Sequence, residues 1–192
     1  MRQKQILPTS FMRTINTTTT TDPMKELHDV VNLENQIIGV ATRKEFLENP
    51  KLMRRSSHIW LENSEGEWWM QQRSRTKDIQ PLHWQSACSG FVKAGASTKR
   101  QVLADAEREL LEELGIKTAL KLYKIVPMPK LTVGGIMVYW CMGKSDGPFR
   151  INKTELKALK SFTLQDIRGK YIKGKIKLTE PFIKEIEMFL AD

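Results

Sequence analysis

The most constraining feature of the sequence is one long amphipathic segment that ends at a glycine. From about residue 97 or 98 to residue 114, apolar side chains recur at helical spacing, and Gly115 follows at the position where helices commonly end. The apolar side chains that share one face are Leu103, Ala106, Leu110 and Leu114. This pattern predicts a helix over 97–114 whose apolar face packs against a core.

A stripe of carboxylates runs beside that apolar face. A rotation of about 100° per residue brings four acids to one side of the helix. They are Asp105, Glu109, Glu112 and Glu113. Carboxylates three and four residues apart repel each other by roughly a few tenths of a kcal/mol per pair. A divalent cation such as Mg²⁺ or Mn²⁺ would offset this repulsion, because it prefers hard oxygen ligands. The alternative is a solvated acidic face that pairs with Arg108 and nearby lysines.

The rest of the chain mixes short strands with helices and contains no repeat. The predicted strands are 29–32, 37–42, 58–62, 67–72, one or two within 84–93, 116–126 and 136–142. The predicted helices near the C-terminus are 155–160, 164–168 and a last one that begins after Thr179. We therefore expect an α/β sandwich.

Length and composition fit one globular domain with a short tail. The 192 residues are 40% hydrophobic and 28% charged, which suits a single folded domain over 23–192. Residues 1–22 are basic, rich in threonine and without a hydrophobic period, so we expect a disordered tail there. An organelle transit peptide has the same composition. An extended tail or an upstream start before Met24 explains the segment equally well.

Cysteine content and hydropathy indicate a cytoplasmic protein, with the transit peptide in 1–22 left open. The two cysteines, Cys88 and Cys141, lie far apart and do not have the spacing of a metal site. No run of about 18 apolar residues is present, so we expect no membrane partner. The net charge of +9 is concentrated in the C-terminal part, most densely in 168–177. That stretch is either a binding surface for an anion or a solvated face.

The segment from Arg108 to Ile116 resembles the second half of the Nudix box, the signature of the Nudix hydrolases. Its sequence is RELLEELGI, where the family pattern is R-E-U-x-E-E-x-G-U and U is a bulky aliphatic residue. Similarity to the branch related to isopentenyl-diphosphate isomerase continues outside the motif, most densely from His58, in segments such as HIW, QRS, TKD and SGFVKAG. The resemblance implies a Nudix-type α/β/α sandwich with a mixed sheet and a catalytic loop-helix-loop.

The first half of the box departs from the family pattern. Counted from Gly90, the expected glutamate falls at Ala96, and eleven residues instead of seven separate this position from Arg108. We interpret the difference as an insertion of about four residues before the helix. It leaves open whether metal binding or activity is weakened or abolished. Asp105 is a candidate substitute for the missing glutamate, because it lies one turn before Glu109 on the same stripe.

For this chain the resemblance implies hydrolysis of a diphosphate linkage in a small molecule, a nucleoside diphosphate derivative or a related compound, by water that Mg²⁺ or Mn²⁺ activates. It assigns metal ligation to Glu109, Glu112 and Glu113. It assigns to Arg108 the positioning of those glutamates. The motif does not fix the general base, for which Glu155 and Glu112 are both candidates, and it does not identify the residues that bind the substrate.

Two other functions compete with hydrolysis. Isomerase activity in this family depends on a cysteine before the glycine and a histidine after it, where this chain has Ser89 and Phe91. Cys88 is displaced by one position, which on a strand turns its side chain to the opposite face, away from the site. The second competitor is a catalytically weakened Nudix-fold module that binds a nucleotide, RNA or protein. We expect a small-molecule diphosphate as the partner, with nucleic acid less favoured and a homodimer left open.

Overall fold

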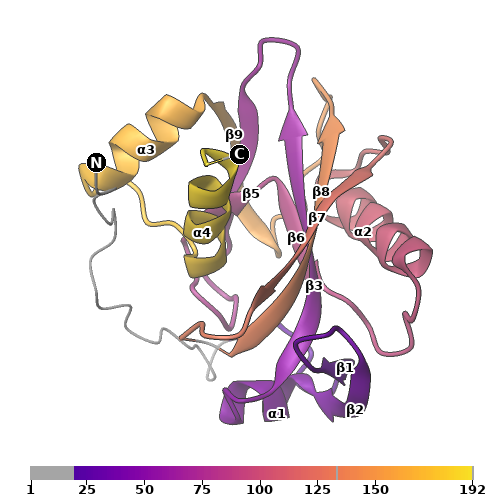
Figure 1. Cartoon of the computed structure of the whole chain (residues 1–192). Coiled ribbons are helices and arrows are strands. Elements are labelled where there is room, and N and C mark those ends of the chain that lie inside the picture. The colour runs from indigo at the N-terminus through magenta and orange to yellow at the C-terminus, as the bar shows by residue number, and fades with distance from the viewer. Residues whose placement is uncertain (1–19, 133, 192) are drawn as a thin grey trace.

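The computed structural model describes residues 20–132 and 134–191 (Figure 1). Its elements follow the chain in the order β1 (Leu27–Val31), β2 (Ile37–Thr42), α1 (Arg43–Glu48), β3 (Met53–Glu62), β4 (Trp68–Arg73), β5 (Trp84–Ser86), β6 (Cys88–Phe91), α2 (Lys99–Leu114), β7 (Lys121–Met128), β8 (Gly135–Lys144), β9 (Leu156–Phe162), α3 (Leu164–Ile172) and α4 (Glu180–Phe189).

The sheet is organised around β3, the strand with the most neighbours. β3 runs parallel to β8 and antiparallel to β6, and β7 adds an antiparallel edge beyond β8. The β1–β2 hairpin joins at the start of β3, while β4 at its end carries both β5 and β9. Within the described ranges, nine strands make one mixed sheet.

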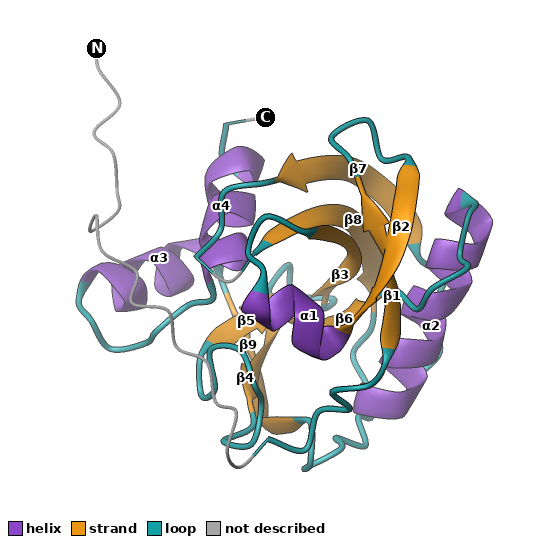
Figure 2. Cartoon of the chain, turned by 90° about the horizontal axis from the view of Figure 1, so that it is seen from below, coloured by secondary structure: helices purple, strands orange, loops and turns teal. Residues whose placement is uncertain are grey.

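Helices cover both faces of the sheet. α2 lies on one face, and α4 with α3 beside it lies on the other (Figures 1 and 2). Because side chains alternate along a strand, Ile59 and Leu61 of β3 pack with Leu110 of α2, whereas Trp60 packs with Phe182 of α4. The expected α/β sandwich with a mixed sheet is confirmed.

The predicted long helix is present as α2, with both ends fixed by local interactions. Thr98 is its N-cap, and Thr98 and Gln101 exchange the two hydrogen bonds of a capping box. At the other end Gly115 adopts a left-handed conformation with φ of 70°, and its N–H bonds to the Leu111 carbonyl. The C-terminal end is also held from outside, since Arg150 N–H donates to the Leu114 carbonyl at 2.8 Å.

The prediction of a helix over 155–160 is wrong. These residues enter β9, which pairs with β4 from Trp68 opposite Phe162 to Arg73 opposite Leu156. Leucine, lysine and alanine favour helix locally. In this chain the main-chain bonds to a neighbouring strand, together with burial of the Leu156 side chain, decide the structure instead.

Other strand boundaries and one helix were also missed. The short helix α1 has a capping box between Thr42 and Glu45 but too few residues to show an apolar period. The first half of β3 is polar in sequence, yet Ser56 and Ser57 are buried there. The predicted strand 116–126 begins later and continues through Pro127, which β7 accommodates because it is an edge strand.

The expected tail, residues 1–22, is described only from residue 20 onward. Residues 1–19 lie outside the described part of the chain, so the expected disorder there is not addressed. Residues 20–22 are described, and Asp22 is buried and bonded to Lys77, so the folded region extends back at least to Asp22. Among the described residues, no helix is long and apolar enough to cross a membrane.

Substitution of Gly115 by Ala should destabilise the fold by about 2 kcal/mol or more, measured by urea denaturation. A side chain strains the left-handed backbone by roughly 1–2 kcal/mol, and a Cβ at Gly115 would lie 2.7 Å from Arg150 Cβ. Gly66→Ala is the matched control, because Gly66 has φ of 77° but nothing within 4 Å of an added Cβ. Equal losses in the two variants would show that the Arg150 contact contributes nothing.

Candidate active site

Glu113 is a carboxylate of α2 that the protein encloses. The residue is 7% exposed, and its Oε2 accepts a hydrogen bond from Gln71 Nε2 of β4 at 3.0 Å. Burial raises the pKa of Glu113 to about 7, and the nearby charge of Glu109 acts in the same direction. Among the described residues, no lysine or arginine forms an ion pair with it.

Glu109 lies one turn earlier on α2 and packs against the main chain of β6. A Cβ at Gly90 would lie 2.7 Å from Glu109 Cδ, so the close approach requires glycine at this position. Burial raises the pKa of Glu109 although Arg108, which donates to its Oε1 at 2.6 Å, acts in the opposite sense. Two neighbouring carboxylates on this helix face are therefore both costly to ionise.

Arg108 contacts the other three carboxylates of the stripe but not Glu113. It bonds to Asp105 at 2.5 Å and to Glu112 at 2.7 Å, in addition to Glu109. Glu112 is the most exposed of the set, with 56% of its side chain accessible. Asp105 Oδ2 is buried and has no hydrogen-bond partner among the described residues.

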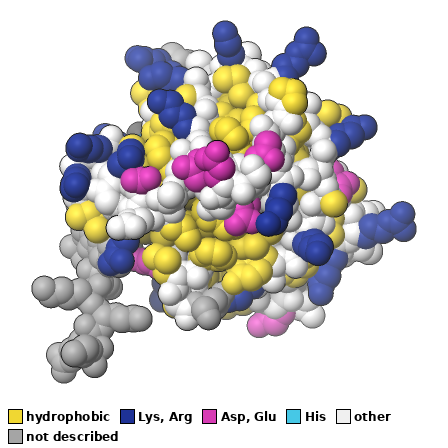
Figure 3. Space-filling view, turned by 90° about the horizontal axis from the view of Figure 1, so that it is seen from above, with side chains coloured by type: hydrophobic (Ala, Val, Ile, Leu, Met, Phe, Trp, Pro, Cys, Tyr) yellow, Lys and Arg dark blue, Asp and Glu magenta, His cyan; other side chains and the backbone are white. Residues whose placement is uncertain are grey.

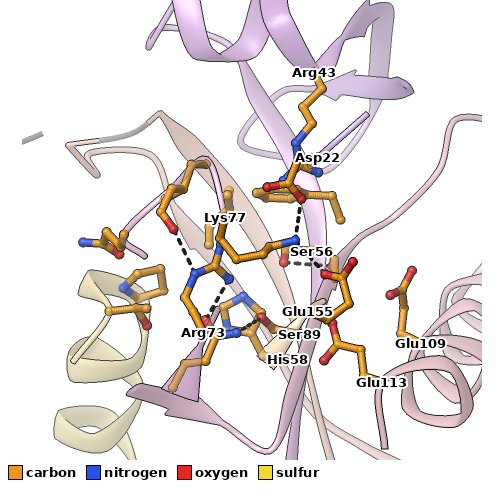
Figure 4. A pocket seen from close by; sticks show the side chains of 18 of the residues that line it. Asp22, Arg43, Ser56, His58, Arg73, Lys77, Ser89, Glu109, Glu113 and Glu155 are labelled. Carbon is orange, nitrogen blue, oxygen red and sulfur yellow. Dashed lines mark hydrogen bonds and ion pairs between the residues drawn. The ribbon is translucent and has the colours of Figure 1, made fainter. Parts of the chain in front are cut away.

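A cavity of about 270 Å³ opens beside these carboxylates (Figure 4). α2 contributes all four predicted site residues to its wall. The rest come from strands β3 to β6 and β8, from the first residues of α1 and α4, and from the segments between these elements. The predicted residues are Arg108, Glu109, Glu112 and Glu113. The structure thus brings together the residues that the sequence pattern singled out. Asp105, the candidate substitute for the missing glutamate, does not line the cavity.

A second group of charged side chains lies across the cavity from α2. Lys77 is held between Asp22 and Glu155, with 2.8 Å between its Nζ and Glu155 Oε2. Burial alone would raise the pKa of Asp22, but Arg43 and Lys77 hold it well below the ordinary value. Arg43 is itself fixed by a bidentate pair with Asp78, at 2.7 and 3.0 Å. This wall places ordered positive charge in the cavity.

The donor set fits a hard divalent cation by its chemistry. Glu109, Glu113 and Glu155 line the same cavity, and a cation there would relieve the burial and mutual repulsion that raise the pKa values of the first two. In the part of the chain that the structure describes, no three such side chains already converge on one point. Arg108 holds Glu109 and Glu112, and Lys77 holds Glu155, so these ion pairs would have to rearrange.

The sequence pattern missed several lining residues, among them Lys77, Asp22 and Arg73. They come from loops and strands far from the helix in sequence, so no local spacing links them to it. Ala96 is in the loop before α2, where its carbonyl accepts a hydrogen bond from Arg55 Nη1 at 2.8 Å. The basic stretch 168–177 supplies no side chain to the cavity. On the face seen in Figure 3, lysine and arginine side chains are spread around the rim.

The orientation expected for Cys88 is wrong in part. Cys88 is fully buried, but on β6 it shares the α2-facing side with Gly90, and its thiol contacts Glu113. Burial and the charges of Glu113 and Glu109 raise the pKa of this thiol well above its ordinary value. Ser89 and Phe91 alternate with these residues and line the cavity.

Comparisons with known protein families and with individual proteins both find Nudix proteins. Residues 52–182 match the family model described as NUDIX domain. The uncharacterized Nudix hydrolase PA4841 of Pseudomonas aeruginosa is 33% identical over 140 residues, which cover 68% of this chain and 75% of that protein. Isopentenyl-diphosphate Delta-isomerase I of Camptotheca acuminata is 33% identical over 100 residues, 45% of this chain and 41% of that protein.

The fold is also found among solved structures. The crystal structure of DR0079 from Deinococcus radiodurans superimposes with a TM-score of 0.67. The match covers 85% of this chain and 98% of that chain at 20% identity. It supports the fold alone.

Substitution of Gly90 by Ala should displace Glu109 and weaken Mn²⁺ binding at least about tenfold, or about 1.4 kcal/mol, in calorimetric titration. The physical reason is the 2.7 Å approach between an added Cβ and Glu109 Cδ. Gly39→Ala is the control, because its Cβ would make an ordinary 3.9 Å contact with Val30. Unchanged Mn²⁺ affinity in Gly90→Ala would show that the position of Glu109 does not matter for the cation.

Glu113 should make the metal-free protein less stable as pH rises. Its pKa moves from the ordinary 4.5 to about 7 on folding, so between these values the folded chain keeps a proton that the unfolded chain has lost. The stabilisation is complete below pH 4.5 and disappears as pH rises through 7. Glu113→Gln should therefore gain about 1.4 kcal/mol per pH unit over wild type in this interval, measured by urea denaturation with a chelator. If the free energies of unfolding of the two proteins change with pH in parallel, the raised pKa of Glu113 is contradicted.

Proposed function

The chain belongs to the Nudix family, and we propose that it is a metal-dependent hydrolase that cleaves a diphosphate linkage in a small molecule. Diphosphate hydrolysis is the general activity of Nudix hydrolases. The specific substrate, a nucleoside diphosphate derivative or a related compound, and the use of Mg²⁺ or Mn²⁺ by this chain are part of the proposal.

One observation carries the proposal: Glu109 and Glu113 are two partly or fully buried carboxylates side by side at a cavity. Burying an anion without a cationic partner is costly, and Glu113 has no ion pair among the described residues. A solvated acidic helix face, the alternative interpretation of this stripe, would leave Glu113 exposed instead of 7% accessible.

The residues can be given roles on the basis of these contacts. Glu109 and Glu113 would hold the cation, with Glu112 as the third candidate. A bound Mg²⁺ or Mn²⁺ supplies Lewis acidity toward phosphoryl oxygens and lowers the pKa of water. Arg108 is a positioning residue, because it bonds to Glu109 and Glu112.

Across the cavity, Lys77 and Glu155 supply the complementary groups. The Lys77 ammonium can bind a phosphoryl oxygen and stabilise the negative charge that grows there. Both Glu155 and Glu112 line the cavity, and each is ion-paired with a basic residue. Glu155 is favoured as general base because 34% of its side chain is accessible, against 56% for Glu112. It would accept the proton of the attacking water.

The site offers little support for isomerase chemistry. Ser89 and Phe91 line the cavity where that reaction uses cysteine and histidine. Cys88, the nearest thiol, is buried against Glu113 with a raised pKa, which disfavours the reactive thiolate.

Glu113→Gln should lower metal-dependent turnover at least about tenfold, on the order of 1.4 kcal/mol in the barrier. The assay is phosphate or product release from ADP-ribose, UDP-glucose and dimethylallyl diphosphate with Mg²⁺ or Mn²⁺. Glu107→Gln is the matched control, because Glu107 lies on the exposed side of the same helix. Ligand binding by folded protein without turnover of any compound would favour the binding module. Turnover unaffected by Glu113→Gln would contradict the assigned role.

A further inference from the structure

A buried histidine–glutamate pair lies at the cavity outside the carboxylate cluster. His58 of β3 bonds through Nδ1 to Oε1 of Glu185 on α4. The second oxygen, Oε2, accepts a hydrogen bond from Trp60 Nε1 at 2.8 Å. Glu185 has no exposed surface, and within the described residues His58 is its one ion-pair partner.

This arrangement fixes the histidine ring. The indole of Trp60 can only donate, which anchors the carboxylate, and the carboxylate in turn binds Nδ1 of His58. The other ring nitrogen, Nε2, has no hydrogen bond to a described residue, and His58 lines the cavity (Figure 4). Imidazoles that are oriented by a second group in this way commonly use the free ring nitrogen for binding or proton transfer. Replacement of a buried ion pair by well-packed apolar residues is often neutral or stabilising, so stability alone does not account for this pair.

The register of β3 and β6 places His58 on the other side of the strands from Glu109. His58 pairs with Ser89, and the next pair is Ser57 with Gly90. Since side chains alternate, His58 and Ser89 point away from the face where Glu109 packs on Gly90. The pair therefore faces the part of the cavity that would hold the group attached to the diphosphate.

Further polar groups surround this part of the cavity. Gln85 Nε2 donates to Ser89 Oγ at 2.8 Å, and Arg73 Nη1 approaches Gln85 Oε1 at 3.4 Å. Ser89 Oγ can still donate its own proton. Leu131 and Ile136 complete the wall with apolar surface.

We propose that His58, oriented by Glu185, hydrogen-bonds the group attached to the diphosphate and makes the site select a polar group over a hydrocarbon one. The inference rests on the proposed function for the placement of the diphosphate. A prenyl group would expel water from Nε2 and from the Ser89 hydroxyl without replacing its hydrogen bonds. Sites built to hydrogen-bond a substrate reject analogues that lack the matching group.

The test measures binding without metal, by calorimetry, of ADP-ribose, UDP-glucose and dimethylallyl diphosphate. Wild type should bind at least one of the two polar compounds roughly tenfold or more tightly than dimethylallyl diphosphate. His58→Asn keeps a donor near the position of Nδ1 but removes Nε2, and should reduce this preference to about threefold or less. His83→Asn is the matched control, since His83 bonds to the Pro81 carbonyl and does not line the cavity. No preference in wild type, or full preference in His58→Asn, would overturn the proposal.

Two further variants separate recognition from folding. Glu185→Gln should weaken binding of the polar compound alone, and should have no further effect in a His58→Asn background. A merely structural role would instead weaken all three ligands together and add to the effect of His58→Asn. If His58→Asn does not fold, His58→Gln, which places its amide near Nε2, should keep part of the preference; loss of binding to every ligand in that folded variant would overturn the proposal.

Hydrolysis of the same compounds with Mg²⁺ distinguishes the two proposals. If the preference for a polar compound over dimethylallyl diphosphate depends on His58 but no compound is hydrolysed, hydrolysis is refuted and the recognition role of His58 is supported. If the compounds are hydrolysed but the protein binds the polar compounds no more tightly than dimethylallyl diphosphate, hydrolysis is supported and the recognition role of His58 is refuted.

Discussion

The packing of α2 on the sheet is the constraint from which the site follows. Ala106, Leu110 and Leu114 are fully buried against β3 and its neighbours, so the rotation of the helix about its axis is fixed. With that rotation Glu113 must enter the edge of the core, and Glu109 must lie over Gly90. Glu109 is bonded to the Arg108 guanidinium, whereas the side chain that donates to Glu113 is the neutral Gln71 amide. The fold thus keeps one carboxyl group of the site, that of Glu113, without an ion-pair partner among the described residues.

The sequence was sufficient to predict the features that depend on neighbours along the chain. The long helix, its Thr98 cap, its end at Gly115 and the carboxylate stripe all follow from local spacing. The α/β class follows as well, because most strands alternate or are continuously apolar. Features set by distant partners could not be predicted in this way. β9 is a strand because β4 lies beside it. Lys77 joins the site through Asp22 and Glu155, and His58 is oriented by a glutamate from the last helix. The resemblance marked their segments, HIW and TKD, but no local spacing assigned either residue to the site.

Coverage of both faces of the sheet lets two adjacent residues of one strand both pack against apolar clusters. Trp68 and Trp69 are adjacent on β4 and point to opposite faces. Trp68 packs against the cluster under α4 and Trp69 against the cluster under α2. The same alternation on β3 and β6 divides the cavity into a face with the carboxylates and a face with His58 and Ser89. A one-residue shift of this register would exchange the two sets of groups.

Asp22 gives the beginning of the folded region a direct connection to the cavity. Its carboxylate bonds to Lys77 and Arg43 and receives the Asp78 main-chain N–H at 2.8 Å. Every described helix and strand begins after Met24, so a chain whose translation began there would contain their sequences but lack this carboxylate. Lys77 would then pair with Glu155 and Arg43 with Asp78, and this wall of the cavity would carry one negative charge fewer. The first residues of the folded region therefore help to set the net charge that the cavity presents to a phosphate group.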